Sequence, residues 1–486
     1  MSAFWPFMAF DPLVAVLAIP AVSAIILVAM PSYWLAARFN ILAAFATLVS
    51  AVMLLGVRPP PGNYLFIDDL NNIFIVLTAF VGFTTSVFSA SYIGHELERG
   101  KLTPGHLRFY HAMYQVLMFA MNLGLTANNI GLMWVAVEMA TLTTVLMVGI
   151  YRTPEAIEAA WKYFILGSVG IALALFGTIL VYMAARPVLG EGTDAMVWTE
   201  LFAHAGSFDT ALINIAFVFL LLGYGTKVGL APLHAWLPDA HAEGPTPISA
   251  VLSGLLLNVA LYALLRFKMI LAAHPGALPA GALMIALGLL SLIFAGFMLY
   301  RRRDIKRMFA YSSIEHMGII VFAFGIGGPL ANFAGLLHMT MHSLTKSAIF
   351  FAVGHIAQAK GTQRINEMGG LTVTHPLLGW GLVLGVVAIA GLPPLGIFTS
   401  EFLLVSSAFS REPLLALILV LGLLLALGAL FMHLNTIAFG PPRGSNHPTD
   451  ASFLPMFAHL ALVLVAGLYL PPALAAWFQH VAEQLG

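Results

Sequence analysis

The sequence predicts an all-α protein that crosses a membrane many times. Of its 486 residues, 60% are hydrophobic and only 9% are charged, and the mean hydropathy is +0.94. A soluble domain could not bury so large an apolar fraction, whereas a bilayer accepts it in helices of about 20 residues. Long apolar stretches recur along the whole chain. The fold class is therefore a polytopic helical membrane protein.

Hydropathy places about fourteen membrane-spanning helices along the chain. The apolar stretch after Phe10 has no basic residue before it and no small-residue cleavage pattern, so we expect a retained first helix rather than a signal peptide. The predicted spans are 12–30, 35–57, 70–93, 110–127, 129–150, 160–184, 210–236, 246–272, 280–299, 308–326, 331–356, 376–407, 414–439 and 455–478.

Lysine and arginine residues predict the orientation of these helices. Loops after the odd-numbered spans hold most of them, with a dense group over 301–307, and loops after the even-numbered spans hold few. The positive-inside rule then puts the 301–307 loop in the cytoplasm and both termini outside, on the periplasmic side of an inner membrane. Lys162, Lys227 and Lys346 fall in or beside apolar spans instead. Of these, Lys162 is close enough to a span end to reach the cytoplasmic interface.

The composition excludes several kinds of chemistry for this chain. It contains no Cys, so it forms neither a disulfide nor a thiolate-ligated iron–sulfur cluster. We find no haem or flavin motif and no glycine-rich phosphate loop, and the formal net charge of zero gives no basic field for nucleic acid. We therefore expect no catalytic residue, no cofactor and no metal in this chain, and no nucleic acid partner.

Two of the predicted spans are interrupted by Gly and Pro. The seventh is interrupted at 229–232, with Pro238 following, and the twelfth at 390–396. Paired interruptions in two halves of a chain are typical of transporters with inverted repeats, in which the ion site lies at the breaks. Simple packing kinks are the alternative. The ionisable residues Lys227 and Glu401 lie close to the two breaks and favour ion sites.

Lys227 and Glu138 are charged residues inside apolar spans. A charge at the centre of a bilayer costs about 2.5–3.5 kcal/mol on insertion scales, so such residues are usually functional. Burial favours the neutral form of each group, whereas the opposite charge of a partner favours the ionised form. Moving such a pair apart would release or take up a proton. A purely structural ion pair is the alternative, although such pairs rarely stabilise more than apolar packing would.

A second group of ionisable residues lies on the eleventh span. His338, His342 and Lys346 are spaced four apart and share one helix face. Histidine titrates near neutrality and suits a proton relay, while satisfied polar packing is the alternative. The intervening residues supply no carboxylate in a metal-binding pattern. Glu315 and His316 add a titratable pair, nearer the predicted cytoplasmic side.

Several segments together resemble one known family. Residues 225–241, 243–249 and 304–313 and the His338-x-x-x-His342-x-x-x-Lys346 motif are similar to the antiporter-like subunits of respiratory complex I, Mrp-type cation/proton antiporters and membrane-bound group 4 hydrogenases. The resemblance covers nearly the whole chain. Three further segments are most similar to the hydrogenase-4 F subunit: 155–163, 254–261 and 324–330.

The resemblance implies two inverted five-helix repeats and a proton route of hydrated half-channels joined by a polar axis. The implied division is 1–109 for the first three helices, 110–275 and 276–440 for the repeats, and 441–486 for the last helix. The residues implied for the route are Glu138, Lys227, His338, His342, Lys346 and Glu401.

One position departs from the family pattern. Where complex I relatives usually carry a lysine in the eighth helix, this chain has Asn258, and an amide does not exchange a proton in this range. Water, His234 or His241 would then bridge the gap, or the route would bypass it.

The resemblance predicts a proton-translocating subunit of a hydrogenase-4 or formate hydrogenlyase-like complex in the lipid bilayer. Peripheral and membrane partner subunits would carry the NiFe and iron–sulfur centres. One alternative is a component of an Mrp-type cation/proton antiporter without a redox partner. Another is a scaffold whose inherited charges no longer conduct.

Overall fold

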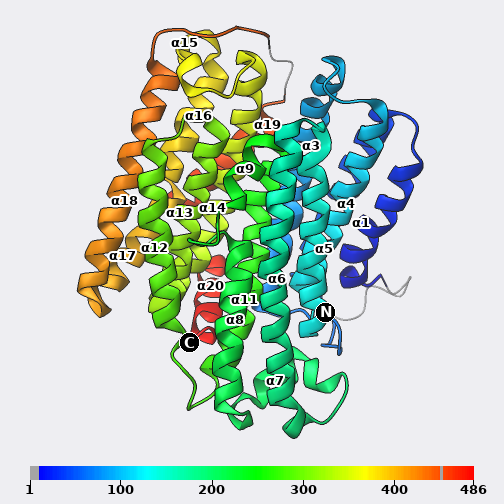
Figure 1. Ribbon diagram of the computed structural model, residues 1–486, viewed down its shortest axis with the longest axis vertical. Coiled ribbons are helices and arrows are strands. Elements are labelled where there is room, and N and C mark those ends of the chain that lie inside the picture. The colour runs from blue at the N-terminus through cyan, green and yellow to red at the C-terminus, as the bar shows by residue number, and fades with distance from the viewer. Residues whose placement is uncertain (1–9, 449–451) are drawn as a thin grey trace.

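The computed structural model describes residues 10–448 and 452–486, and most of these residues are helical (Figure 1). Over these ranges, β-pairing is limited to a few isolated bridges in loops. The long helices run side by side through the body of the molecule (Figure 1). The all-α class predicted from composition is therefore confirmed.

The helices follow one another with short connections. In the first half they are α1 Pro12–Ala29, α2 Tyr33–Met53, α3 Asp69–Glu98, α4 Pro104–Thr126, α5 Ile130–Val148, α6 Pro154–Leu189, α7 Trp198–Ala203, α8 Thr210–Val228, α9 Trp236–Glu243, α10 Thr246–Val251 and α11 Leu257–Ala272. In the second half they are α12 Ala280–Tyr300, α13 Ile305–Ile326, α14 Gly328–Lys360, α15 Leu371–Thr374, α16 Pro376–Ile389, α17 Gly396–Arg411, α18 Pro413–Leu434, α19 Leu454–Leu468 and α20 Pro472–Gln484.

Of the helices that the structure describes, 10 are long and apolar enough to cross a membrane, and up to 11 when one bent pair counts as a single span. The protein is thus a multi-span membrane protein. The larger count of about fourteen spans remains a prediction.

Both predicted interruptions are present. The helix that ends at α8 resumes as α9, and the one that ends at α16 resumes as α17. At the first break, Gly229 has a φ of +83° and donates its N–H to the Gly225 carbonyl at 3.0 Å. The Trp236 indole donates to the Thr226 carbonyl at 2.8 Å, and the Ser291 hydroxyl of α12 accepts from the Ala231 N–H at 2.9 Å. These contacts satisfy backbone groups that the break would otherwise leave unpaired in lipid.

The end of the chain differs from the prediction of one span over 455–478. It forms two helices, α19 and α20, which meet at an angle of 81°. The cause is the pair Pro471–Pro472, because proline lacks an N–H and restricts the residue before it to extended backbone. After this turn, α20 packs against α14.

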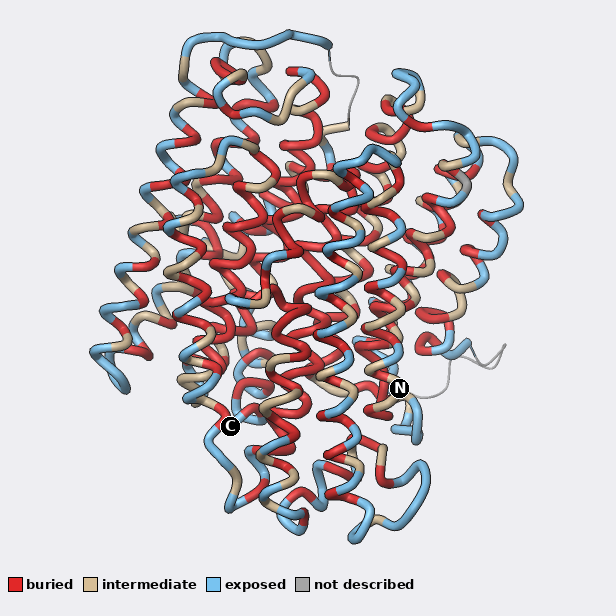
Figure 2. The backbone as a smooth tube through the Cα atoms, viewed as in Figure 1, coloured by how far each residue is buried: buried red, intermediate tan, exposed pale blue. Residues whose placement is uncertain are grey.

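Burial separates central helices from lipid-facing ones (Figure 2). The most apolar stretch of the α10–α11 span is 100% buried and that of α13 is 94% buried, whereas the corresponding values for α12 and α18 are 39% and 33%. The outer helices therefore present apolar side chains outward, as contact with hydrocarbon requires. The polar side chains described below lie mainly on or beside the central helices.

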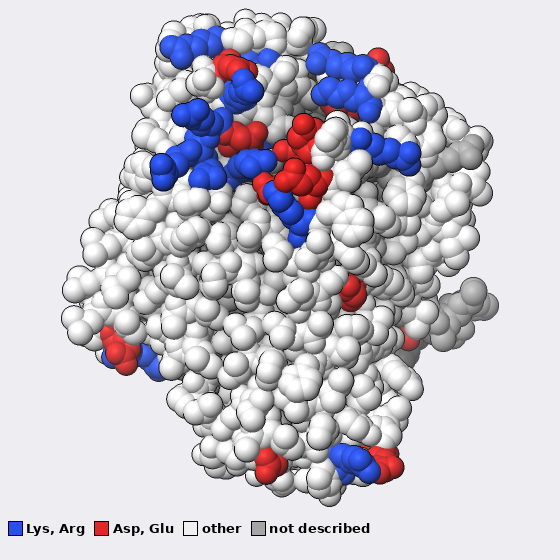
Figure 3. All heavy atoms as spheres, in the orientation of Figure 1, with Lys and Arg blue, Asp and Glu red and all other residues white. Residues whose placement is uncertain are grey.

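Charged side chains gather at one end of the molecule (Figure 3). Lys and Arg are dense there and interspersed with Asp and Glu, while the flank of the molecule is almost free of charge (Figure 3). Both ends of the described chain lie toward the other side of the bundle (Figure 1). This distribution has the asymmetry that the positive-inside rule uses.

An ion pair at the opposite end from this cluster connects α11 to the start of α3. The guanidinium of Arg266, which is 0% exposed, contacts both carboxylate oxygens of Asp68 at 2.7 Å. It also lies 4.4 Å from the Trp198 ring centroid and donates to the Tyr262 hydroxyl at 2.9 Å. Asp68 in turn caps α3 by accepting the Asn71 N–H. Three segments distant in sequence are thereby joined.

We expect Asp68→Asn to destabilise the protein strongly. Burial alone would raise the pKa of the Asp68 carboxyl, but the charge and hydrogen bonds of Arg266 outweigh it and lower that pKa below its ordinary value. A carboxyl of this kind stabilises the fold above its unfolded-state pKa of about 4, and the effect disappears as pH falls through the lowered folded-state pKa. At neutral pH the variant leaves a buried guanidinium uncompensated, which costs about 3–5 kcal/mol.

The measurement is thermal unfolding in detergent at several pH values. The difference between wild type and Asp68→Asn should be largest at neutral pH and shrink below about pH 4. Asp69→Asn is the matched control, because Asp69 pairs with a partly exposed Arg58 at 2.6 Å and its loss should cost only about 0–1 kcal/mol. Equal stability of the two variants would contradict the role given to Asp68.

Candidate functional site

Lys227 and Glu138 lie opposite each other between α8 and α5. Lys227 is in the last turn before the break, and its Nζ is 3.7 Å from Glu138 Oε2. The ammonium donates a shorter hydrogen bond, of 2.7 Å, to the Thr141 hydroxyl one turn along α5. Lys227 is 1% exposed, while Glu138 is 17% exposed. The ion pair is thus a loose one, in which a neutral hydroxyl is the nearest partner of the buried ammonium.

Aromatic rings and a glycine shape the space around Lys227. The ammonium lies 5.9 Å from the centroid of the Tyr163 ring, which stacks on Trp236 at 4.2 Å. A Cβ atom at Gly167 of α6 would come within 2.8 Å of Lys227 Nζ. Trp236 also bonds the carbonyl of Thr226, next to Lys227. The position of the ammonium is therefore coupled to the broken backbone that follows it.

The three ionisable residues of α14 face α13 and are buried. His338 Nε2 and His316 Nδ1 are 2.9 Å apart, and the Lys346 ammonium donates to the Phe309 carbonyl at 3.0 Å. The His342 and His316 rings have centroids 5.5 Å apart. In a His–His hydrogen bond one ring nitrogen carries the proton and the other accepts it, so the two imidazoles can exchange roles.

His316 was predicted to lie nearer the cytoplasmic side, and this placement was wrong. It is level with His338, because α13 and α14 run in opposite directions and cross at these residues. The available signal was its neighbour Glu315, whose Oε2 lies 3.5 Å from His316 Nε2. Sequence reasoning missed two further contacts, the Thr141 hydroxyl at Lys227 and the Ser400 hydroxyl, which is 3.0 Å from His338 Nδ1.

Glu401 lies at the second break, close to the histidines. Its carboxylate contacts Gly391, where φ is +66° and where a Cβ atom would overlap the carboxylate. One atom each of His316, His338 and Glu401 lie within 4.8 Å of one another. These donors could hold a divalent cation, but hydrogen bonds to His316 and Ser400 already engage both ring nitrogens of His338. A cavity of about 260 Å³ is lined by Glu315 and Glu401.

Between Lys227 and Lys346 the candidates differ in their contacts. The His241 ring of α9 stacks on Phe350 of α14 at 4.9 Å, and neither of its nitrogens has a protein partner within the described chain. Phe350 follows Lys346 by one helical turn. His234 lies in the first break, 4.7 Å from the Phe294 ring. Both histidines are therefore placed between the two buried lysines' helices.

Asn258 is held by α14. Its amide nitrogen donates to the Ser343 hydroxyl at 2.7 Å and to the Met339 carbonyl at 3.2 Å. The residue follows a π-helical turn over Leu252–Leu256 in the same span. These bonds give Asn258 a packing role between the two central helices, and its amide has no proton to transfer in the neutral range.

Lys162 lies outside this buried series. Its side chain is 48% exposed and pairs with Glu158 at 2.6 Å and with Asp239 at 3.2 Å. Arg307 also contacts Asp239, at 2.9 Å. Lys162 thus belongs to a partly exposed ion-pair network, in agreement with a lysine that reaches the interface.

Comparison with known proteins identifies the family. The family described as NADH:quinone oxidoreductase/Mrp antiporter, TM matches residues 127–426. The chain belongs to this family. The matched range contains every residue of the buried series from Glu138 to Glu401.

Individual relatives agree with this assignment. A hydrogenase-4 component F homolog of Methylacidiphilum infernorum is 64% identical, over 97% of this chain and 99% of its own length. A chain of the membrane-bound sulfane sulfur reductase, an archaeal respiratory membrane complex, has a TM-score of 0.87 at 23% identity, over 97% of this chain and 98% of that one. A chain of respiratory complex I from Thermus thermophilus has a TM-score of 0.81 at 22% identity, over 98% and 100%. The protein is thus an antiporter-like membrane subunit.

Proposed function

We propose that this family member translocates protons as a subunit of a hydrogenase-4 or formate hydrogenlyase-like complex. The observation that carries the proposal is the series of buried ionisable side chains that extends from the first helix break to the second. Its members are Glu138, Lys227, His241, Lys346, His342, His338, His316, Glu315 and Glu401. Ionisable groups inside a membrane span are costly, and in such number they mark an ion path.

The loose pair of Lys227 and Glu138 is the proposed switch. When Glu138 is close, its charge favours the protonated lysine; when the two separate, burial favours the neutral amine and the proton leaves. The Thr141 hydroxyl keeps a hydrogen-bond partner at the lysine in both states. Chemistry in a partner subunit would drive the separation and so couple redox energy to proton release.

The released proton would then cross the central helices to Glu401. Buried ring nitrogens of His241 and His342 have no protein partner in the part of the chain that the structure describes. Buried polar atoms of this kind normally bind ordered water, which would connect them. From Lys346 the path follows His342, then the His316–His338 pair. We infer that Glu315 and Glu401, at the cavity by the second break, pass the proton onward.

The two similar breaks support a division into inverted repeats over 110–275 and 276–440. In the proposed arrangement both termini face the periplasm across an inner membrane, because the end with most Lys and Arg then faces the cytoplasm. The name of the 64% identical relative supports hydrogenase partners. Nickel–iron and iron–sulfur centres would belong to those partner subunits.

A component of an Mrp-type cation/proton antiporter is the second candidate, since the matched family includes such antiporters. Purification of the native complex through a tag on this chain, followed by mass spectrometry and metal assay, separates the two. We expect nickel, iron and hydrogenase-like subunits to co-purify. Recovery of only membrane polypeptides without these metals would favour the antiporter and overturn the hydrogenase assignment.

Lys227→Ala should abolish coupled proton movement while the complex still assembles. The variant removes the group that releases the proton but leaves the apolar packing of α8. The measurement is proton uptake by membrane vesicles driven by the electron donor of the complex, with subunit content checked in the same membranes. Lys101→Ala is the control, because Lys101 is 55% exposed and pairs only with Glu96. Normal pumping by Lys227→Ala would contradict the switch.

His241→Phe and Asn258→Ala test how the route crosses the middle of the protein. Phenylalanine can keep the stacking on Phe350 but cannot carry a proton, so proton movement should fall at least several-fold. Asn258→Ala should retain most of it and lose about 1 kcal/mol of stability, because only packing bonds are removed. If Asn258→Ala blocks proton movement and His241→Phe does not, the route through His241 is wrong.

A further inference from the structure

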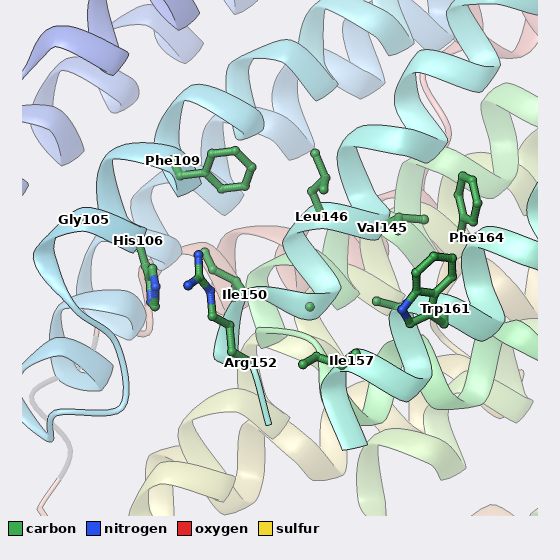
Figure 4. A pocket seen from close by; sticks show the side chains of 12 residues that line it. Gly105, His106, Phe109, Val145, Leu146, Ile150, Arg152, Ile157, Trp161 and Phe164 are labelled. Carbon is green, nitrogen blue, oxygen red and sulfur yellow. The ribbon is translucent and has the colours of Figure 1, made fainter. Parts of the chain in front are cut away.

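A second site lies where α4 and α6 begin and α5 ends. It is a pocket of about 630 Å³, and none of the proposed proton-pathway residues lines it. The residues used below are His106, Phe109, Leu146, Arg152, Trp161 and Phe164. Figure 4 shows His106 and Arg152 at one end of the pocket and the rings of Trp161 and Phe164 at the other. The pocket is therefore polar at one end and apolar along its walls.

Arg152 gives the polar end its charge. It follows the last turn of α5 with a φ of +56°, and within the described residues it is the one non-glycine position with positive φ. Its side chain is exposed and makes no ion pair with any described residue. A cation without a counter-charge beside an apolar pocket favours an anionic ligand.

The start of α4 adds to this preference. Its N-cap residue, Thr103, makes no side-chain capping bond, and Pro104 has no N–H. The N–H groups of Gly105 and His106, both of which line the pocket, have no acceptor among the described residues. Unpaired amides at a helix start attract negative charge, while the carbonyl end of α5 opposes it in part. The excess positive charge therefore comes from Arg152 together with the α4 start.

The walls of the pocket open toward the bilayer. Phe109, Leu146 and Trp161 are 40%, 51% and 58% exposed. The apolar surface continues along the outer faces of the helices through Leu142 and Ile165, which are 43% and 55% exposed. Tryptophan is enriched at the level of lipid headgroups. The ligand that matches this surface has an anionic head at Arg152 and hydrocarbon along α5 and α6.

We propose that this pocket binds an anionic phospholipid. The phosphate would lie between Arg152 and the α4 start, and the acyl chains would cover Leu146 and Trp161. The pocket is at the end of the bundle where Lys and Arg gather (Figure 3), and basic pockets between membrane helices on that side bind anionic headgroups. Zwitterionic lipids fit less well, because their ammonium group would lie near the arginine.

Lipid retention by the native complex tests this site. The tagged complex is reconstituted in vesicles of equal parts phosphatidylglycerol and phosphatidylethanolamine, then re-extracted and analysed by native mass spectrometry. Wild type should retain phosphatidylglycerol in preference. Arg152→Asn should reduce that retention about fivefold, the effect of one basic contact at a lipid surface. Asparagine tolerates positive φ, so the backbone is preserved.

Two further variants complete the design. Arg152→Lys keeps the charge and should retain the lipid, whereas Arg301→Gln removes an exposed arginine from another loop and should change nothing. A photoreactive benzoylphenylalanine in place of Trp161 should cross-link to lipid in the native complex. Equal retention by wild type and Arg152→Asn, or cross-linking to a partner polypeptide instead of lipid, would overturn the proposal. Neither outcome depends on proton translocation.

Discussion

Every backbone group and every charge inside a bilayer needs a partner, because hydrocarbon supplies none. The rest of this structure depends on that constraint. It permits broken helices at only two places, and at the first of them Trp236 and Ser291 supply the missing bonds. It also explains why the polar residues lie mainly on or beside the central helices, where protein rather than lipid surrounds them.

The buried lysines satisfy the constraint in two different ways. Lys227 has a carboxylate nearby, although its shortest bond is to a hydroxyl. Lys346 bonds the Phe309 carbonyl, and Lys306 bonds the carbonyls of Ala242 and Gly244 at 2.9 and 2.6 Å. A lysine held by carbonyls can lose its proton without leaving an unpaired anion behind. This difference suits Lys227 to respond to a partner charge, and the other two to transmit.

The two sites that we propose use opposite sides of the same helices. The inner face of α5 carries Glu138 and Thr141 toward α8, while its outer end contributes Leu146 to the lipid pocket. Both Glu138 and the pocket therefore depend on how α5 packs against α6. A bound lipid would support this packing from outside, where the protein has no neighbour of its own in the described chain.

Much of this organisation could be predicted from the sequence. Hydropathy determines the helical membrane class, since no other fold satisfies so apolar a chain, and Gly and Pro determine where helices break. The four-residue spacing of His338, His342 and Lys346 places them on one face without any tertiary information. Only the tertiary structure decided the partners: His316 at His338, Thr141 at Lys227, and Lys162 outside at Asp239. The physical reason is that periodicity within one helix sets which face a residue occupies, whereas the register and tilt between helices arise from packing of the whole bundle.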